Sequence, residues 1–141
     1  MGTDGSETAT RAVEAAIGLA GSLNAELEIV SAYQPIPDRQ LRRERLEAPE
    51  ELQWAIGPKE EVEGVLSAAL ERAEKAGVVA HSHAVEGEAA DGIIAAAEEL
   101  NADLIVVGNK GMSGARRFLL GSVPNKVSHH APCSVLIVRT T

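Results

Sequence analysis

The spacing of apolar residues changes repeatedly along the chain between a helical and an extended pattern. Helical spacing, or a short run between helix start and stop signals, predicts helices at residues 7–23, 59–76, 88–100 and 122–130. Alternating or continuous apolar runs predict strands at residues 25–32, 78–85, 103–107 and 134–139. Strands that alternate with helices of this length favour right-handed crossovers and a parallel sheet covered on both faces. The expected fold class is therefore α/β, with a three-layer α/β/α arrangement around an open parallel sheet.

Two stretches depart from this pattern. Residues 33–57 contain three prolines and a dense mixture of charges, which predicts a long connection with room for a short helix; such loops often cover binding sites. Residues 1–6 lead almost directly into the first helix, although a doubly wound fold usually starts with a strand. We therefore expect a first strand truncated in this numbering, with upstream residues absent from it or another segment filling the gap.

Composition narrows the possible classes of protein. A chain of 141 residues fits one domain, residues 1–141, and it contains no run of 18 apolar residues and no visible signal peptide. A single cysteine, Cys133, cannot form an internal disulfide, which favours a cytoplasmic protein. The acidic net charge of −8 and only three aromatic residues argue against nucleic acid as a partner. We also expect no membrane association.

The charge is unevenly distributed along the sequence. Residues 1–103 hold all 21 acidic residues, whereas residues 104–141 hold five basic residues and no acidic one. This asymmetry favours an anion site in the C-terminal quarter. The alternative is a mostly buried strand accompanied by a few solvated bases.

Two segments stand where open α/β sheets bind ligands, outside the carboxyl ends of the strands: one directly before the first predicted helix and one directly after a predicted strand. They are residues 2–6 and residues 108–114, the second of which leads to Gly121 and Ser122 at a helix start. Glycines allow backbone N–H groups to approach an anion closely, and a helix N-terminus attracts negative charge. Lys110, Arg116 and Arg117 add positive charge nearby. A set of tight turns that merely require glycine is the alternative interpretation.

These residues also carry a family resemblance. Gly108, Gly111, Gly121 and Ser122 have the spacing G-2x-G-9x-G-[ST], which resembles the motif of ATP-binding universal stress proteins. The segments at residues 3–6, 102–108, 119–123 and 131–138 are similar to that family as well, so the resemblance covers essentially the whole chain. It implies a Rossmann-like fold of the adenine nucleotide alpha hydrolase type, with strand order 3-2-1-4-5.

The resemblance implies a nucleotide site and assigns residues to it. Asp4 would lie by the nucleoside, with Thr3 and Gly5 beside it, and Ala32 would face the adenine. The phosphates would lie against the motif residues with Val107 and Val123 flanking them, and we add the neighbouring Lys110, Gly114 and Arg117. The full predicted set is Thr3, Asp4, Gly5, Ala32, Val107, Gly108, Lys110, Gly111, Gly114, Arg117, Gly121, Ser122 and Val123. The implied ligand is ATP, or else ADP or AMP, with Mg²⁺ accompanying the phosphates, and the implied partner is a second copy paired through residues 134–139.

We expect a ligand-dependent regulator rather than a dedicated enzyme. No Asp, Glu or His occurs between Gly108 and Ser128, so nothing in that segment can orient an attacking water, and no catalytic residue is predicted. Two alternatives remain: a slow ATP hydrolase or phosphotransferase using the same site, and an interaction module that binds cyclic AMP or AMP.

Other candidate residues favour structural interpretations. His81 and His83 share a strand face and have the residue type of metal ligands, but no further ligand is evident beside them, so no metal site is predicted. His129 and His130 suit a helix C-terminus, where positive charge is favourable. The arginines of residues 39–45 are interleaved with acidic residues, which favours a solvated helix face over an arginine that reaches the phosphates.

Overall fold

The computed structural model describes residues 1–110 and 120–141 and has an alternating α/β order. The helices are α1 (Glu7–Leu23), α2 (Asp38–Glu47), α3 (Pro58–Lys75), α4 (Ala89–Glu99) and α5 (Ser122–His130), with a 3₁₀ helix η1 (Glu50–Ala55). The strands are β1 (Leu27–Tyr33), β2 (Ala80–Glu86), β3 (Leu104–Gly108) and β4 (Ser134–Val138). The sequence thus predicted every strand and four of the helices to within a few residues, and α2 and η1 lie in the expected long connection.

The strands form two parallel pairs, β1 with β2 and β3 with β4. The first three residues of the chain lie between these pairs. The amide of Val30 in β1 donates to the carbonyl of Met1, and the amide of Thr3 donates back to the carbonyl of Val30. On the other side, the amide of Gly2 donates to the carbonyl of Val106 in β3 at 3.2 Å. The spatial order is therefore β2–β1–residues 1–3–β3–β4, which corresponds to the expected order 3-2-1-4-5.

Residues 1–3 therefore fill the gap between β1 and β3 only beside the carboxyl-terminal parts of these two strands. Gly2 forms a single bridge with Val30, and a cavity of about 490 Å³ remains between the amino-terminal halves of β1 and β3. The Met1 amine donates to the carbonyl of Glu28 at 2.8 Å, and burial lowers its pKa from 8.0 to about 6. Residues 1–3 thus occupy the central position of the sheet, and Thr3 and Asp4 lie at the edge where ligands bind.

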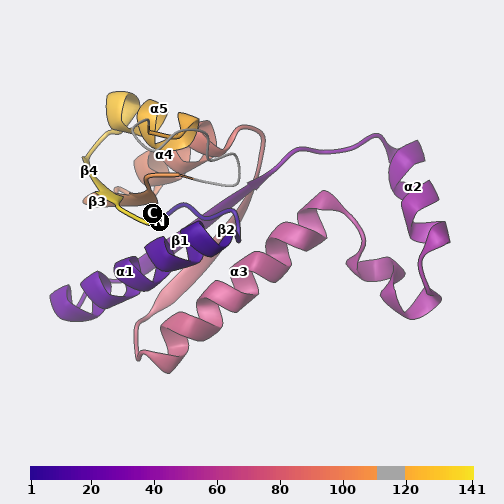
Figure 1. The fold of residues 1–141 in the computed structure, drawn as a ribbon, viewed down its shortest axis with the longest axis horizontal. Coiled ribbons are helices and arrows are strands. Elements are labelled where there is room, and N and C mark those ends of the chain that lie inside the picture. The colour runs from indigo at the N-terminus through magenta and orange to yellow at the C-terminus, as the bar shows by residue number, and fades with distance from the viewer. Residues whose placement is uncertain (111–119) are drawn as a thin grey trace.

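Helices cover both faces of the sheet. One apolar cluster joins α1 and α3 to β1 and includes Val13, Ile17 and Leu66, while a second joins α4 and α5 to β3 and includes Ile93 and Val127. The middle of β3 is buried on both faces, as its continuous apolar run predicted. Figure 1 shows α1 and α3 running alongside β1 and β2, with α4 and α5 gathered near β3 and β4.

The connection after β1 projects from this body. Figure 1 shows α2 and η1 as an arm beyond the end of α3. None of their residues is buried, and Arg45 anchors the arm by donating to the carbonyl of Ile56 and to the Glu60 carboxylate. Across the described residues, no helix combines the length and apolar character that a membrane span needs.

Candidate functional site

A cavity of about 220 Å³ lies at the carboxyl ends of the strands and collects most of the predicted site residues. Its lining includes Thr3, Asp4, Ala32, Val107, Gly108, Lys110, Gly121, Ser122 and Val123. Gly5 is not part of the lining, and the predicted residues Gly111, Gly114 and Arg117 lie outside the described residues. Residues separated by more than 100 positions in sequence therefore meet at one edge of the sheet, where a parallel α/β fold binds its ligands.

Gly5 instead shapes the turn that starts α1. Its φ of +77° lies in the left-handed region, and a Cβ there would come within 2.6 Å of Val65. Only glycine fits such a position without strain. The residues directly before this turn, Thr3 and Asp4, line the cavity.

Six further lining residues were not in the predicted set, although Gly2 belongs to the candidate segment 2–6. These residues are Gly2, Ala9, Val30, Ala89, Ile93 and Pro124. Ala89 and Ile93 lie four residues apart on α4 and therefore share one face of that helix. The sequence shows this four-residue spacing, but the buried face of an ordinary helix has the same spacing. The spacing therefore does not distinguish a binding site from the core.

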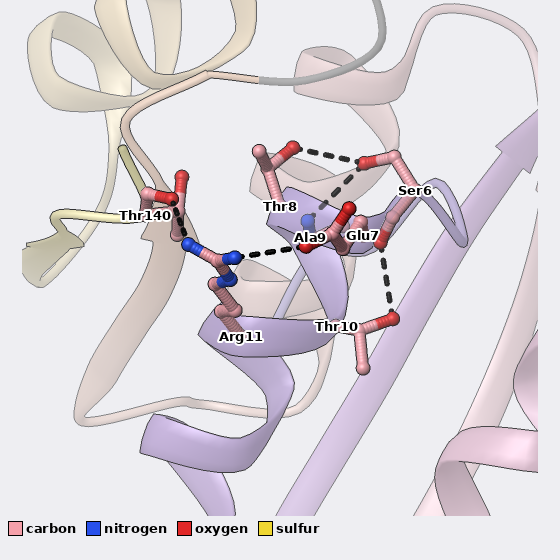
Figure 2. A network of polar contacts seen from close by, with 7 residues as sticks. All are labelled: Ser6, Glu7, Thr8, Ala9, Thr10, Arg11 and Thr140. Carbon is pink, nitrogen blue, oxygen red and sulfur yellow. Dashed lines mark hydrogen bonds and ion pairs between the residues drawn. The ribbon is translucent and has the colours of Figure 1, made fainter.

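The N-terminus of α1 is capped by the chain's own side chains. Ser6 Oγ accepts a hydrogen bond from the amide of Ala9 at 3.1 Å, and Figure 2 shows this cap together with the contact between Ser6 and Thr8. Asp4 Oδ1 in turn accepts from the amide of Ser6 and from its hydroxyl, at 3.0 and 2.6 Å. Negative charge and a hydroxyl therefore already occupy the positive end of this helix.

The N-terminus of α5 is built differently. Its N-cap is Gly121, and no side-chain cap is present among the described residues. Pro124 in the first turn has no N–H, and the amide of Asn125 already donates to the carbonyl of Gly121. The amides of Ser122 and Val123 remain at the positive end of the helix, on residues that line the cavity.

Asn109 joins the end of β3 to the start of α5. Its amide donates to the carbonyl of Val138 in β4, and its own carbonyl accepts from the amide of Gly121, both at 2.9 Å. Its side-chain Oδ1 accepts from the amide and the hydroxyl of Thr140, each at 2.8 Å. Asn109 therefore fixes the start of α5 against the ends of β3 and β4.

The buried residue Thr140 extends this network to α1. Figure 2 shows Arg11 lying between Glu7 and Thr140: it donates to the Thr140 carbonyl at 3.2 Å and to the Glu7 carboxylate at 2.8 Å. The chain end after β4 is thus tied to α1 directly and to α5 through Asn109, which are two of the helices that border the cavity. The sequence did not identify Asn109, Thr140 or Arg11, because each acts through a contact between distant segments.

Among the described residues, one base of the cationic C-terminal quarter lies at the cavity. Of its three described bases, Lys110 lines the cavity. Lys126 pairs with Asp91 on α4 at 2.6 Å, and Arg139 donates to the carbonyl of Thr141. The anion site predicted from charge therefore rests, in the described residues, on one lysine and one helix N-terminus.

The arm of α2 and η1 stands apart from this cavity. Its arginines are absent from the lining, as expected for a solvated helix face. A larger hollow of about 610 Å³ lies over α2, but charged side chains on one exposed helix border it, so it lacks the convergent elements of a ligand site.

Comparison with known proteins supports the same picture. A family model described as the universal stress protein family matches residues 1–139. A universal stress protein of Mycobacterium tuberculosis is 39% identical over 142 residues, covering 100% of this chain and 94% of that protein. Universal stress protein YxiE of Bacillus subtilis is 37% identical over 139 residues, covering 96% of this chain and 94% of that protein.

A solved structure agrees in fold as well as sequence. The crystal structure of a universal stress protein in complex with cAMP is 34% identical, covers 100% of this chain and 94% of that chain, and matches it with a TM-score of 0.71. Family model, relatives and fold each match nearly all of the 141 residues. The chain belongs to the universal stress protein family.

Proposed function

We propose that this protein binds an adenine nucleotide, ATP in the first instance, and acts as a ligand-dependent regulator. The observation that carries the proposal is the convergence of nine predicted site residues on one cavity, beside the N-terminus of α5, for which the described residues provide no side-chain cap. A helix N-terminus with accessible amides is a ready anion site, and Lys110 adds positive charge to it. The solved relative in complex with cAMP supports a nucleotide as the occupant.

The two sides of the cavity suit the two ends of a nucleotide. Val30, Ala32 and Ile93 offer an apolar surface for a base, and the α5 side offers amides and a hydroxyl for phosphate. A volume of 220 Å³ is below the roughly 300–1,000 Å³ typical of whole ligand sites, so the phosphates of ATP would extend out of the described cavity. Mg²⁺ would be held chiefly by phosphate oxygens, with Asp4 as the carboxylate in the lining.

A panel of ligands tests this function by calorimetry. ATP, ADP, AMP, cyclic AMP, GTP and inorganic phosphate are titrated separately into the protein, with and without Mg²⁺. We expect saturable binding of adenine nucleotides and much weaker binding of phosphate and GTP. Equal affinity for phosphate and ATP would remove the adenine part of the proposal.

Cyclic AMP is a second candidate ligand because the solved relative was crystallised with it. A single phosphate diester would place less charge at α5 than a triphosphate does. If the α5 amides select the ligand, ATP binds more tightly than cyclic AMP. The reverse order in the same titrations would make cyclic AMP the resident ligand.

Regulation is favoured over catalysis by the polar groups at the cavity. Asp4 is the carboxylate among its described lining residues, and its Oδ1 already accepts two hydrogen bonds from Ser6. We therefore expect at most slow ATP hydrolysis. Turnover above about 1 s⁻¹, the low end of ordinary enzymes, would contradict a regulatory role.

We further propose that two copies associate through β4, in the cytoplasm. Within the described structure β4 pairs only with β3, and Leu136 on it is 41% exposed. An exposed edge strand offers unpaired backbone groups to a second strand. Sedimentation velocity of the wild type should show a dimer and that of Leu136→Lys a monomer, whereas a dimer in both would place the interface elsewhere.

A further inference from the structure

Two glutamates and two histidines share one face of the β1–β2 pair, near the amino ends of these strands. Glu28 in β1 lies opposite His81 in the parallel register, and Val30 lies opposite His83. Side chains two residues apart on a strand point to the same face, so Glu26, directly before β1, joins Glu28 on that face. The register thus brings together carboxylates and imidazoles that are more than 50 residues apart in sequence.

The side chains meet closely. One ligand atom from each of Glu26, Glu28 and His81 lies within 4.8 Å of the other two. His83 Nε2 lies 2.6 Å from Glu28 Oε2, so this imidazole is hydrogen-bonded to the central carboxylate. Glu26 and His81 are exposed and Glu28 is half-buried, which leaves the cluster open to ions from solvent.

We propose that Glu26, Glu28 and His81 bind a divalent transition-metal ion, with Zn²⁺ as the expected occupant. Carboxylate and imidazole together suit Zn²⁺, whereas Mg²⁺ prefers an octahedral shell of oxygen atoms. Three protein ligands and one water would complete a tetrahedral zinc ion. The sequence alone offered no partner for His81 and His83, because only the pairing of β1 with β2 shows that Glu26 and Glu28 stand beside them.

The geometry requires a small rearrangement. Zinc bonds to nitrogen and oxygen are about 2.0–2.2 Å long, so two ligands of a tetrahedral ion lie about 3.4 Å apart. The ligand atoms must therefore approach one another by at most about 1.4 Å, which two exposed residues can do by rotation. His83 is a positioning residue here, since its hydrogen bond orients the Glu28 carboxylate.

This metal site is separate from the nucleotide cavity. Glu28 lies four residues before Ala32 along β1, or about 13 Å at the rise of a strand. None of Glu26, Glu28, His81 and His83 lines that cavity. The metal proposal therefore stands or falls independently of nucleotide binding.

Calorimetry with ZnCl₂ tests the proposal on the full chain in chelator-treated, nucleotide-free buffer. We expect one zinc ion per chain and an affinity for Mg²⁺ at least 100-fold lower. His81→Ala and Glu26→Gln should each weaken zinc binding about tenfold or more. His83→Ala should weaken zinc binding less, because His83 only orients Glu28. His83→Gln should restore the wild-type affinity, since an amide also donates a hydrogen bond. Both main variants alter exposed side chains, and circular dichroism checks that they fold.

The histidine pair of α5 provides the matched control. His129→Ala/His130→Ala removes two exposed histidines that are not part of the cluster and should leave zinc affinity unchanged. Co²⁺ gives a second readout, because a tetrahedral cobalt complex has visible absorption that His81→Ala should abolish. Zinc affinity that is unchanged in His81→Ala and Glu26→Gln, or that is lost in the α5 control, would overturn the proposal. Unaltered nucleotide binding in His81→Ala would separate the two sites.

Discussion

Two helices begin at the same edge of the sheet and present their N-termini in opposite ways. At α1, Ser6 caps the amide of Ala9 and Asp4 adds a carboxylate, so the positive end of the helix is satisfied by the chain itself. At α5, Gly121 stands in the cap position without a side-chain cap among the described residues. The chain therefore satisfies the first helix end itself, and we propose that the second offers its amides to a ligand. The difference comes down to serine at one cap position and glycine at the other.

The largest expected effect comes from giving α5 a cap of its own. In Gly121→Asp, the new carboxylate accepts from the first amides of α5 and repels phosphate. We expect nucleotide affinity to fall about 100-fold or more, while the free energy of unfolding stays level or rises by about 0.5–2 kcal/mol. Calorimetry and urea denaturation measure the two quantities.

Gly121→Ala is the matched control for this variant. A Cβ at Gly121 would lie 3.5 Å from its nearest neighbour, which is an ordinary contact, and φ is −60°. Affinity should therefore change little. Unchanged affinity in Gly121→Asp itself would refute the assignment of phosphate to α5.

The next effect should come from the residue that holds α5 in place. Asn109→Ala leaves the amide and hydroxyl of the buried Thr140 without their acceptor, which costs about 1–3 kcal/mol of folding free energy. Nucleotide affinity should fall by a few-fold at most, because the side-chain tie to Thr140 is lost while the backbone bonds of residue 109 to Val138 and Gly121 remain. Asn125→Ala, on the exposed side of α5, is the control and should alter neither quantity. If Asn109→Ala matched this control, the network would have no role in the site.

Removing the cap of α1 should affect stability alone. Ser6→Ala removes the acceptor for the amide of Ala9 and should lower the free energy of unfolding by about 1 kcal/mol. We expect nucleotide affinity to stay within about twofold, since this helix end serves the fold. Denaturation with and without nucleotide measures both effects. A large loss of affinity would make the two helix ends functionally alike.

The smallest effect is expected at the single described lysine of the cavity. Lys110→Gln should weaken ATP binding by only a few-fold, because a partly exposed charge is screened by solvent and salt. AMP, with fewer phosphate charges, should lose less than ATP. Lys126→Gln is the control, since Lys126 pairs with Asp91 instead. Titrations of ATP at two salt concentrations measure how much the charge of Lys110 contributes to the affinity.

The sequence allowed the prediction of periodic elements and of residues next to strand ends. Helical periodicity located α1, α3 and α4 closely, and the glycine spacing located Gly108 and Gly121, because both signals are local. The contacts of Asn109 and the meeting of Glu28 with His81 depend on strand pairing, which a single sequence does not reveal. The position of residues 1–3 between β1 and β3, directly before Asp4, likewise depends on hydrogen bonds between distant segments.

The central claim is that phosphate lies on the amides of α5 and not on those of α1. Amide chemical shifts of isotope-labelled protein, followed by NMR during titration with ATP, test this most directly. We predict the largest shift changes at Gly121, Ser122 and Val123, with Gly108 next and little change at Ala9. Changes confined to the α1 N-terminus or to the α2 arm, with residues 121–123 unaffected, would contradict the account.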